Sequence, residues 1–427
     1  MKTLAWSNLS QADRTAALAR PAARRSPELI DGVRAIIEEV RTGGWEALCR
    51  VAERIDGAAP QCIAVAPVAA EARRSLPAEA VAAMELAARN IRAFHEASRP
   101  ADTRLETMPG LVVEKLWRPL ERVGLYVPGG ATPLFSTLLM LALPARAAGV
   151  EDIVVVTPPG PNGLAPAIAL AAELCGVEQV WTVGGAQAIA ALAFGAGDIP
   201  ACPKICGPGN AWVAEAKAQV SALPGGPAID MPAGPSELMV IADATASAAM
   251  VAADLLSQAE HDSSAQVLLV STDEGLAAAV EQELNRQLPL LPRRALAEQA
   301  LQHGHILIAT DLQEAAGIAN AYAPEHLCLA LDDAAALVPL IRNAGAVFAG
   351  HAAAETFGDY LAGSSHVLPT DGAARAWSGI TTHSFMKAMS VQHVSSQAGK
   401  ALAASAATLA RLEALEAHAR AADARAA

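Results

Sequence analysis

The spacing of apolar and polar positions divides the chain into a helical beginning, a long middle in which strands and helices alternate, and a helical end. Residues 27–51 and 78–98 repeat apolar side chains at helical spacing, with arginine and glutamate between them. After residue 118, short β-branched runs alternate with alanine-rich stretches. That alternation is typical of strand–helix units around a parallel sheet, so the sequence predicts an α/β fold.

Two series of such units follow one another. The expected strands are residues 153–156, 180–183 and a third from Ile205 in the first series, and residues 238–241, 267–270, 306–308, 327–331 and 347–349 in the second. Asp243, Asp273 and Asp311 stand where connecting helices should begin. We expect two incomplete Rossmann-like parallel-sheet domains, and their duplication stays open because no sequence repeat is strong enough to prove it.

The same patterns predict the domain boundaries. We expect an N-terminal helical segment in residues 1–25, a first α/β domain in residues 26–125 and 237–380, a second α/β domain in residues 126–236, and a C-terminal helical arm in residues 381–427. The helical pattern of the arm begins at Lys387, and Leu402, Leu409 and Leu412 give it an apolar stripe. Because that stripe is too narrow to form a core by itself, we expect the arm to dock on another chain.

Composition limits the partners. At 427 residues the chain is long enough for more than one core, and an aromatic content of 4% favours helix-rich packing over a β-sandwich. A net charge of −13 argues against nucleic acid or an anionic membrane as a partner, because both are bound through basic surfaces. The most apolar stretch, residues 138–145, is too short to span a bilayer, and no secretory leader is visible. The six cysteines form no CxxC pair, so we expect buried thiols and a cytoplasmic enzyme.

Three glycine-rich turns raise the question of a nucleotide. They are Gly129-Gly130, Gly184-Gly185 and the run from Gly207 to Gly209. None belongs to a G-x-G-x-x-G fingerprint that is followed by an acidic residue. Each turn either lets the backbone approach a phosphate at a helix N-terminus or is an ordinary connection between a strand and a helix. Both interpretations stay open from these residues alone.

Several polar residues also allow two interpretations. Gln258 and His261 are three positions apart and share a face of a helix, either as metal ligands or as a polar helix end. Glu325 and His326 directly precede an apolar strand, either as a proton-transfer pair or as a structural pair. Asp359, His366, Glu413 and His418 carry no signal by themselves.

Taken together, these segments resemble the histidinol dehydrogenase family over nearly the whole chain. The matching runs are GLYVPGG (124–130), VGGAQAIA (183–190), GPGN (207–210), DMPAGPSE (230–237), LLSQAEH (255–261), APEHL (323–327) and GDY (358–360). The order and spacing of these runs are more specific than any single one of them.

The resemblance implies a zinc- and NAD-dependent oxidation of L-histidinol through L-histidinal to L-histidine, the last step of histidine biosynthesis. It implies that zinc is held by Gln258, His261, Asp359 and His418. The net charge of such a site stays positive, because its ligands are two neutral imidazoles, an amide and only one carboxylate. The metal would therefore bind and orient the nitrogen atoms of the substrate. The implied substrate contacts are Ser236, Gln258, His261, His326, Asp359, Glu413 and His418.

The resemblance also implies the remaining roles. Tyr126, Gln187 and Asn210 match the positions that contact NAD, which would make residues 126–236 the NAD-contacting domain. His326 would take the proton of the alcohol, and Glu325 would activate the water that attacks a bound aldehyde. The arm of the family reaches a neighbouring subunit, so the resemblance implies a homodimer in which Glu413 and His418 complete the partner's site.

Besides an alanine where glycine is common in the terminal segment 413–418, two positions depart from the family pattern. Asp262 stands where glycine is usual after the metal-ligating histidine, and Ser365 stands where asparagine is usual before His366. Neither removes an implied ligand or base. They leave open a related enzyme that oxidises another small polar alcohol twice, such as a sulfonated diol. A zinc protein without redox activity is disfavoured by the intact Tyr126 and Glu325-His326 pair.

Overall fold

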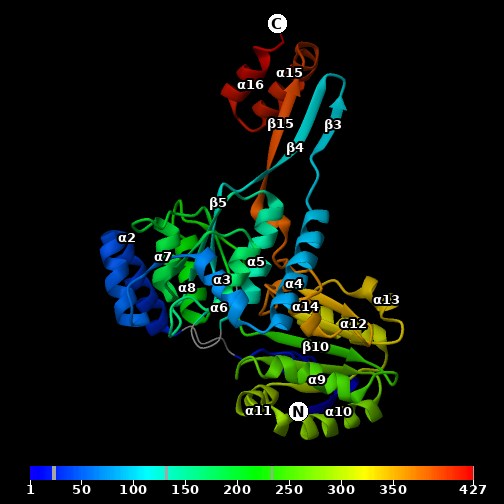
Figure 1. Cartoon of the computed structure of the whole chain (residues 1–427). Helices are drawn as coiled ribbons and strands as arrows, with labels where there is room; N and C mark the ends of the chain where they lie inside the picture. Colours follow the sequence, from blue (N-terminus) through cyan, green and yellow to red (C-terminus); the bar gives the residue numbers. More distant parts are fainter. Residues whose placement is uncertain (22–25, 130–132, 232–233, 427) are drawn as a thin grey trace.

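The structure is a computed structural model that describes residues 1–21, 26–129, 133–231 and 234–426. Two α/β bodies, each built on a six-stranded sheet, lie one above the other, and a long ribbon carries two helices away from them (Figure 1). Three residues of the family motifs, Gly130, Pro232 and Ala233, lie outside the described ranges.

The first sheet has the strand order β2-β7-β6-β5-β8-β9, and its neighbouring strands are parallel except β2 with β7. Its strands are β2 (Cys62–Ala64), β5 (Arg122–Tyr126), β6 (Asp152–Thr157), β7 (Gln179–Thr182), β8 (Lys204–Cys206) and β9 (Ala228–Ile229). The central strand β6 is buried on both faces, which explains its unbroken β-branched run.

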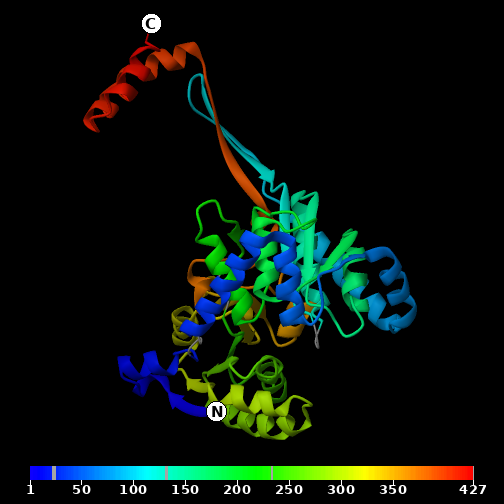
Figure 2. The same cartoon turned by 90° about the vertical axis from the view of Figure 1, so that its left-hand side faces the viewer.

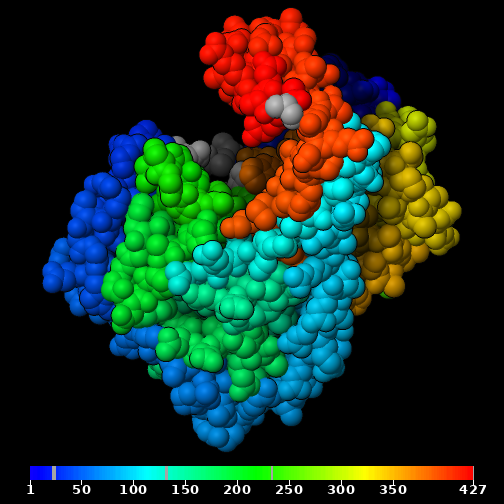
Figure 3. All heavy atoms as spheres, turned by 90° about the horizontal axis from the view of Figure 1, so that it is seen from above, coloured from blue at the N-terminus to red at the C-terminus, as the bar shows by residue number. Residues whose placement is uncertain are grey.

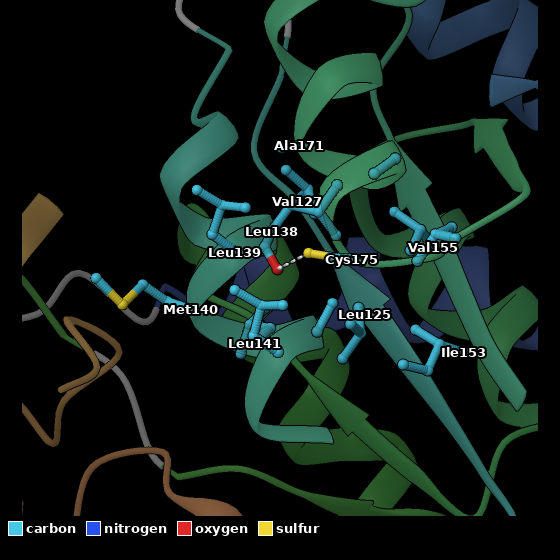
Figure 4. Packing of buried hydrophobic residues seen from close by; sticks show 14 of the residues in the cluster. Leu125, Val127, Leu138, Leu139, Met140, Leu141, Ile153, Val155, Ala171 and Cys175 are labelled. Carbon is cyan, nitrogen blue, oxygen red and sulfur yellow. Dashed lines mark hydrogen bonds between the residues drawn. The ribbon is translucent and has the colours of Figure 1, made fainter. Parts of the chain in front are cut away.

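Helices cover both faces of this sheet. One face carries α2 (Pro27–Asp56), α7 (Gly185–Phe194) and α8 (Ala211–Ser221), and the other carries α3 (Val65–Ser75), α4 (Ala78–Ala97), α5 (Phe135–Ala148) and α6 (Pro166–Leu174). Figure 4 shows the second of these cores, where Leu125 and Val155 of the sheet pack with Leu141 of α5. The Cys175 thiol donates a hydrogen bond to the carbonyl of Leu138 at 3.9 Å, so this cysteine is part of the packed core as expected.

The second sheet has the order β1-β12-β11-β10-β13-β14 and is parallel throughout. Its strands are β1 (Lys2–Ala5), β10 (Glu237–Ala242), β11 (Gln266–Ser271), β12 (His305–Ile308), β13 (His326–Ala330) and β14 (Ala346–Ala349). Successive residues of β10 point to opposite faces, so Leu238 packs in one core and Met239 in the other.

Helices again cover both faces of the second sheet. One face carries α9 (Ala248–Ala259), α10 (Glu274–Gln287) and α11 (Arg294–Gln302), and the other carries α1 (Gln11–Ala17), α12 (Leu312–Tyr322) and α13 (Ala334–Leu337). The short helix α14 (Glu355–Tyr360) follows β14. Asp273 and Asp311 cap α10 and α12 as predicted, but α9 begins after Ser247 and Asp243 instead accepts hydrogen bonds within the preceding turn.

The two sheets share one arrangement. In each sheet, five neighbouring strands come from one continuous part of the chain. Numbered by their order along that part, they lie side by side as 3-2-1-4-5: β7-β6-β5-β8-β9 in the first sheet and β12-β11-β10-β13-β14 in the second. Each sheet gains one further strand beside its third, contributed by an earlier segment. This is the Rossmann strand order without its sixth strand, so the prediction of two incomplete Rossmann-like domains is confirmed.

The ribbon is a three-stranded antiparallel sheet in the order β15-β4-β3, formed by β3 (Thr103–Met108), β4 (Leu111–Pro119) and β15 (Met386–Val394). It carries α15 (Ser396–Leu412) and α16 (Glu416–Asp423), which pack on each other at its far end (Figures 1 and 2). Seen from above, these helices project to one side of the molecule (Figure 3). Leu409 and Leu412 are 64% and 79% exposed, so the apolar stripe of the arm is uncovered in the single chain.

Three predictions about boundaries were wrong. Residues 26–125 do not share a sheet with residues 237–380, because β2 and β5 belong to the first sheet. Residues 1–25 contain β1, an edge strand that reaches the second sheet by pairing with β12. The segment after Lys387, predicted as helix, continues as strand to Val394. Because the strand is exposed on both faces, its sequence lacks the alternation of apolar and polar residues that would have indicated a strand. No helix among the described residues combines the length and apolar character needed to cross a membrane.

Candidate active site

The pair Glu325 and His326 lies at the N-terminal edge of the second sheet. His326 begins β13 and pairs with Leu238 of β10, so both side chains lie beside Glu237, the first residue of β10. The Glu237 amide donates to Glu325 Oε2 at 2.8 Å, and His326 Nδ1 is 3.1 Å from the Glu237 carbonyl. Because a carbonyl only accepts, Nδ1 must carry a proton in this contact. In the neutral imidazole, Nε2 is then the free proton acceptor.

Helix α14 brings two further carboxylates to the same imidazole. Glu355 and Asp359 are four residues apart and therefore on one face of the helix. Glu355 Oε1 and Glu325 Oε2 each lie 3.6 Å from His326 Nδ1, and Asp359 Oδ1 lies 3.6 Å from Nε2. The Ser257 hydroxyl donates to Glu355 Oε2 at 3.2 Å and so ties α14 to α9.

Burial and mutual charge shift the pKa values of this cluster. Burial raises the pKa of Glu325 to about 8 and that of Glu355 to about 7. Burial by itself lowers the pKa of His326, but the carboxylates of Glu325, Asp359 and Glu355 outweigh it and raise the pKa to about 10. When its three carboxylates are ionised the cluster has a surplus of negative charge, and a divalent cation would neutralise that charge and favour the neutral imidazole.

Unpartnered polar atoms test whether a metal fits here. Among the described residues, Gln258 Oε1, His326 Nε2 and Asp359 Oδ1 are buried without a hydrogen-bond partner. Ligand atoms of His326, Glu355 and Asp359 all lie within 4.8 Å of one another. Buried polar atoms are normally satisfied, so the unpartnered His326 Nε2 and Asp359 Oδ1, which lie 3.6 Å apart in this group, fit a bound cation.

The implied zinc ligands are only partly brought together. Gln258 is buried near the end of α9, next to Ser257. His261 lies in the turn after the helix, and its amide donates to the Gln258 carbonyl at 3.2 Å. Partial desolvation lowers the pKa of His261, against the opposing charge of Asp359, and favours the neutral form that binds metals. Ser236 directly precedes β10, beside the cluster.

The two implied site residues on the arm lie elsewhere. Glu413 follows α15 and His418 is on α16, and both are exposed. Among the described residues, neither side chain has a hydrogen bond or an ion pair. Figure 1 places these helices at the opposite end of the molecule from α9 and α14. Within one chain, the structure therefore does not bring Glu413 and His418 to the cluster.

The implied NAD contacts lie at the C-terminal edge of the first sheet. Tyr126 ends β5, and its hydroxyl accepts a hydrogen bond from the Gly185 amide at 3.3 Å. Gln187 is fully buried in α7, where its Nε2 donates to Asp56 Oδ2 at 3.1 Å while its Oε1 has no partner among the described residues. Asp56 also accepts from the Gly184 amide at 3.0 Å.

Asn210 marks the neighbouring turn at the same edge. Its side chain caps α8 by accepting from the amides of Trp212 and Val213. The turn requires glycine at 207, where φ is +130° and a Cβ would lie 2.0 Å from the Tyr126 carbonyl oxygen. A buried ion pair holds this glycine: Asp230 accepts from its amide at 2.7 Å, and Lys217 donates to its carbonyl at 2.8 Å.

Sequence reasoning missed Glu355 and Asp56 and assigned no role to His366. His366 Nδ1 contacts the Asp359 carbonyl at 2.9 Å, and its Nε2 is 3.3 Å from the Thr137 hydroxyl on α5, so it joins the two bodies. Helical spacing from Asp359 was the available signal for Glu355. The two departures from the family pattern have structural roles: Asp262 Oδ1 accepts from the Ser264 amide, and Ser365 Oγ accepts from the Val367 amide.

Comparison with known proteins identifies the family. The histidinol dehydrogenase family model matches residues 19–426. The chain is 49% identical to the histidinol dehydrogenase of Xylella fastidiosa over 424 residues, which cover 99% of this chain and 98% of that protein. The chain belongs to the histidinol dehydrogenase family. The resemblance carried by the motifs is thereby confirmed, and with it the prediction that the chain is a dehydrogenase.

Other members of the family agree over the whole length. The histidinol dehydrogenase of Xanthomonas euvesicatoria is 48% identical over 423 residues, 99% of this chain and 98% of that protein. The crystal structure of histidinol dehydrogenase from Elizabethkingia anophelis superposes with a TM-score of 0.95 at 37% identity, covering 100% of this chain and 98% of that one. The two bodies, the ribbon and the arm therefore make up the family's fold.

Proposed function

We propose that the chain oxidises L-histidinol through L-histidinal to L-histidine, using zinc and two molecules of NAD for each turnover. The single observation that carries this proposal is the buried cluster of His326, Glu325 and Asp359 in a chain of this family, in which His326 Nε2 and Asp359 Oδ1 have no hydrogen-bond partner among the described residues. A proton acceptor, a carboxylate and a fitting cation site are the groups that two successive oxidations at one carbon require.

Zinc would be held by Gln258, His261 and Asp359, with His418 supplied by a second copy of the chain. When bound, the metal supplies positive charge that fixes the amino and imidazole nitrogens of the substrate in one orientation. The unpartnered oxygens of Gln258 and Asp359 support this assignment. Ser236, at the start of β10, and Glu413 of the second copy would complete the substrate pocket.

His326 and Glu325 would divide the proton transfers. The Nε2 atom of His326 takes the proton of the substrate hydroxyl while hydride passes to the nicotinamide. In the second oxidation the Glu325 carboxylate takes a proton from water, and that water attacks the aldehyde carbon. His326 would return its first proton to the carbonyl oxygen as the water attacks, and it would then accept a hydroxyl proton as the hydrate gives up its hydride. The Glu237 backbone holds both side chains, so neither needs to reorganise between the two steps.

NAD would bind at the C-terminal edge of the first sheet, against Tyr126, Gln187 and Asn210. The unpartnered Oε1 of Gln187 supports this, because it offers a buried acceptor to a ligand. The turn held by Gly207 allows close approach of the backbone without the usual glycine fingerprint. We expect the reaction to take place in the cytoplasm, as the unpaired cysteines suggest.

A homodimer with shared sites follows from the same proposal. Glu413 and His418 are exposed on an arm whose leucines are uncovered, and the cluster in the same chain lacks them. A second copy placed by a twofold axis would receive the arm and return its own.

Product stoichiometry tests the proposal. Each L-histidinol consumed should yield two NADH and one L-histidine, with no free aldehyde accumulating. A panel of small polar alcohols that includes a sulfonated diol is assayed beside it. One NADH for each alcohol would contradict the double oxidation, and turnover of the sulfonated diol in preference to L-histidinol would favour the related enzyme instead.

A further inference from the structure

We propose that Arg20 is a positioning residue for the catalytic pair, because its guanidinium joins the starts of the two strands that hold Glu325 and His326. Arg20 lies in the segment between α1 and α2, outside every motif of the family. Its side chain is 15% exposed. The inference deepens the proposed function and rests on it for the roles of Glu325 and His326.

The first contact of Arg20 is to the start of β10. Its Nε and Nη2 atoms donate to the two carboxylate oxygens of Glu237, the second bond measuring 2.8 Å. The Glu237 side chain is 3% exposed and also accepts from the Asp371 amide at 2.8 Å. A two-pronged bond to a buried carboxylate fixes its direction as well as its position, which an ammonium group does not do.

The second contact is to the approach to β13. The Nη2 atom of Arg20 also donates to the carbonyl oxygens of Tyr322 and Ala323, at 2.9 and 3.3 Å. Tyr322 is the last residue of α12, and Ala323 after it adopts the left-handed conformation that turns the chain toward Pro324 and Glu325. The guanidinium carbon lies 4.0 Å from the centre of the Tyr322 ring. One side chain therefore fixes the turn that delivers the catalytic pair.

Glu237 connects Arg20 to the side chains of Glu325 and His326. Arg20 holds its carboxylate, while its backbone amide and carbonyl hold Glu325 Oε2 and His326 Nδ1. A shift of β10 against β13 would move the two backbone groups that set the orientation of the acid and the imidazole. A displacement of about 1 Å in a catalytic constellation can lower the rate by about 10²-fold.

A merely stabilising ion pair predicts a different result. It would lower the melting temperature and the folded fraction, yet leave kcat for each folded, zinc-loaded site unchanged. A positioning role lowers kcat itself. It also leaves KM for NAD unchanged, because the implied NAD contacts lie on the other sheet.

The test compares Arg20→Ala, Arg20→Lys and the control Arg14→Ala in the full-length, zinc-loaded protein. Arg14 belongs to the same N-terminal segment and stacks on Trp6, with its guanidinium carbon 5.2 Å from the ring centre. We expect Arg20→Ala to lower kcat by about 10²-fold at unchanged KM for NAD. Guanidinium chloride at low, non-denaturing concentration should restore part of that loss, whereas the control keeps its activity and gains nothing from the salt.

Two further readouts keep the outcome decisive. The ¹⁵N resonances of the His326 imidazole, assigned with His326→Asn, should move in Arg20→Ala and stay in place in Arg14→Ala. If Arg20→Ala does not fold, the same measurements are made on Arg20→Lys. Lysine keeps the positive charge but cannot form the two parallel hydrogen bonds to the Glu237 carboxylate. A kcat and an imidazole spectrum equal to wild type in the folded variant would overturn the proposal. The kinetics are measured with whichever alcohol of the panel the wild type oxidises. If that alcohol is not L-histidinol, the proposed function is contradicted, but the positioning role of Arg20 is still tested.

Discussion

The two sheets have the same strand order, yet they present their polar residues at opposite edges. In the first sheet, Tyr126 ends β5 and Gly207 follows β8 at the C-terminal edge, between the strands where the order reverses. In the second sheet the corresponding strands are β10 and β13, and Glu237 and His326 stand at their N-terminal edge. One topology therefore supports two kinds of site.

The difference follows from what each edge offers. At the C-terminal edge, helices α7 and α8 begin, and their unpaired amides suit a phosphate or another acceptor. At the N-terminal edge, the first residues of the strands have backbone groups that the ladder does not use. The Glu237 amide is such a group and binds the Glu325 carboxylate, and the carbonyl of the same residue contacts His326 Nδ1. We infer that the first edge suits a cofactor and that the second edge suits proton transfer.

Removal of zinc should have the largest effect. A chelator should abolish turnover, because the substrate nitrogens lose the charge that orients them, and added zinc should restore it. The fold should persist, since each sheet is covered by apolar cores that need no metal. Circular dichroism of the chelated protein measures this, and cooperative unfolding at room temperature would contradict it.

Substitution of the base should come next. His326→Asn should slow both half-reactions by a factor of about 10² to 10⁴, the usual loss when a general base is removed. Rapid-mixing measurements that start from L-histidinol and from L-histidinal follow the two steps separately. A normal rate from either substrate would show that another group accepts that proton.

Glu325→Gln should separate the two oxidations. Only the second requires an activated water, so oxidation of supplied L-histidinal should slow far more than the first hydride transfer. The amide keeps the size of the side chain and can still accept from the Glu237 amide, which limits structural disturbance. Equal slowing of both steps would contradict the division of roles between Glu325 and His326.

The arm should give a smaller but selective signal. Gln258→Ala and His418→Ala are each expected to be inactive, and their co-expression should recover roughly a quarter of wild-type activity, since random pairing makes half the dimers mixed and each mixed dimer has one intact site. The purified mixed dimer, which has one intact site of two, should show roughly half of wild-type activity. If it remains inactive, His418 serves its own chain and the sites are not shared.

Most of the fold could be predicted because buried parallel strands have unmistakable sequences. The run at β6 is β-branched, the runs of the second sheet are apolar and uninterrupted, and the structure places strands there. The segments that escaped prediction pair over long distances. β1 joins β12, and β15 joins β4 in an exposed ribbon, so neither has a local pattern that reveals its partner.

In the candidate site, too, some residues could be predicted from local sequence and others could not. Motifs located Glu325, His326 and Asp359, and helical spacing was available for Glu355. Arg20 could not be found in this way, because its partner Glu237 is 217 positions away and each residue by itself is an ordinary charged side chain. Contacts that form only on folding leave no signal in a single sequence.

The contrast between the two edges can be tested most directly by measuring NAD binding in one variant from each. Isothermal titration of the zinc-loaded protein would compare Gln187→Ala, at the edge of the first sheet, with His326→Asn, at the edge of the second. Loss of a buried hydrogen-bonding group should weaken NAD binding by about tenfold in Gln187→Ala. His326→Asn should bind NAD as the wild type does, although it turns over slowly. If NAD binding were weakened in His326→Asn and unchanged in Gln187→Ala, the assignment of cofactor and chemistry to opposite edges would be contradicted.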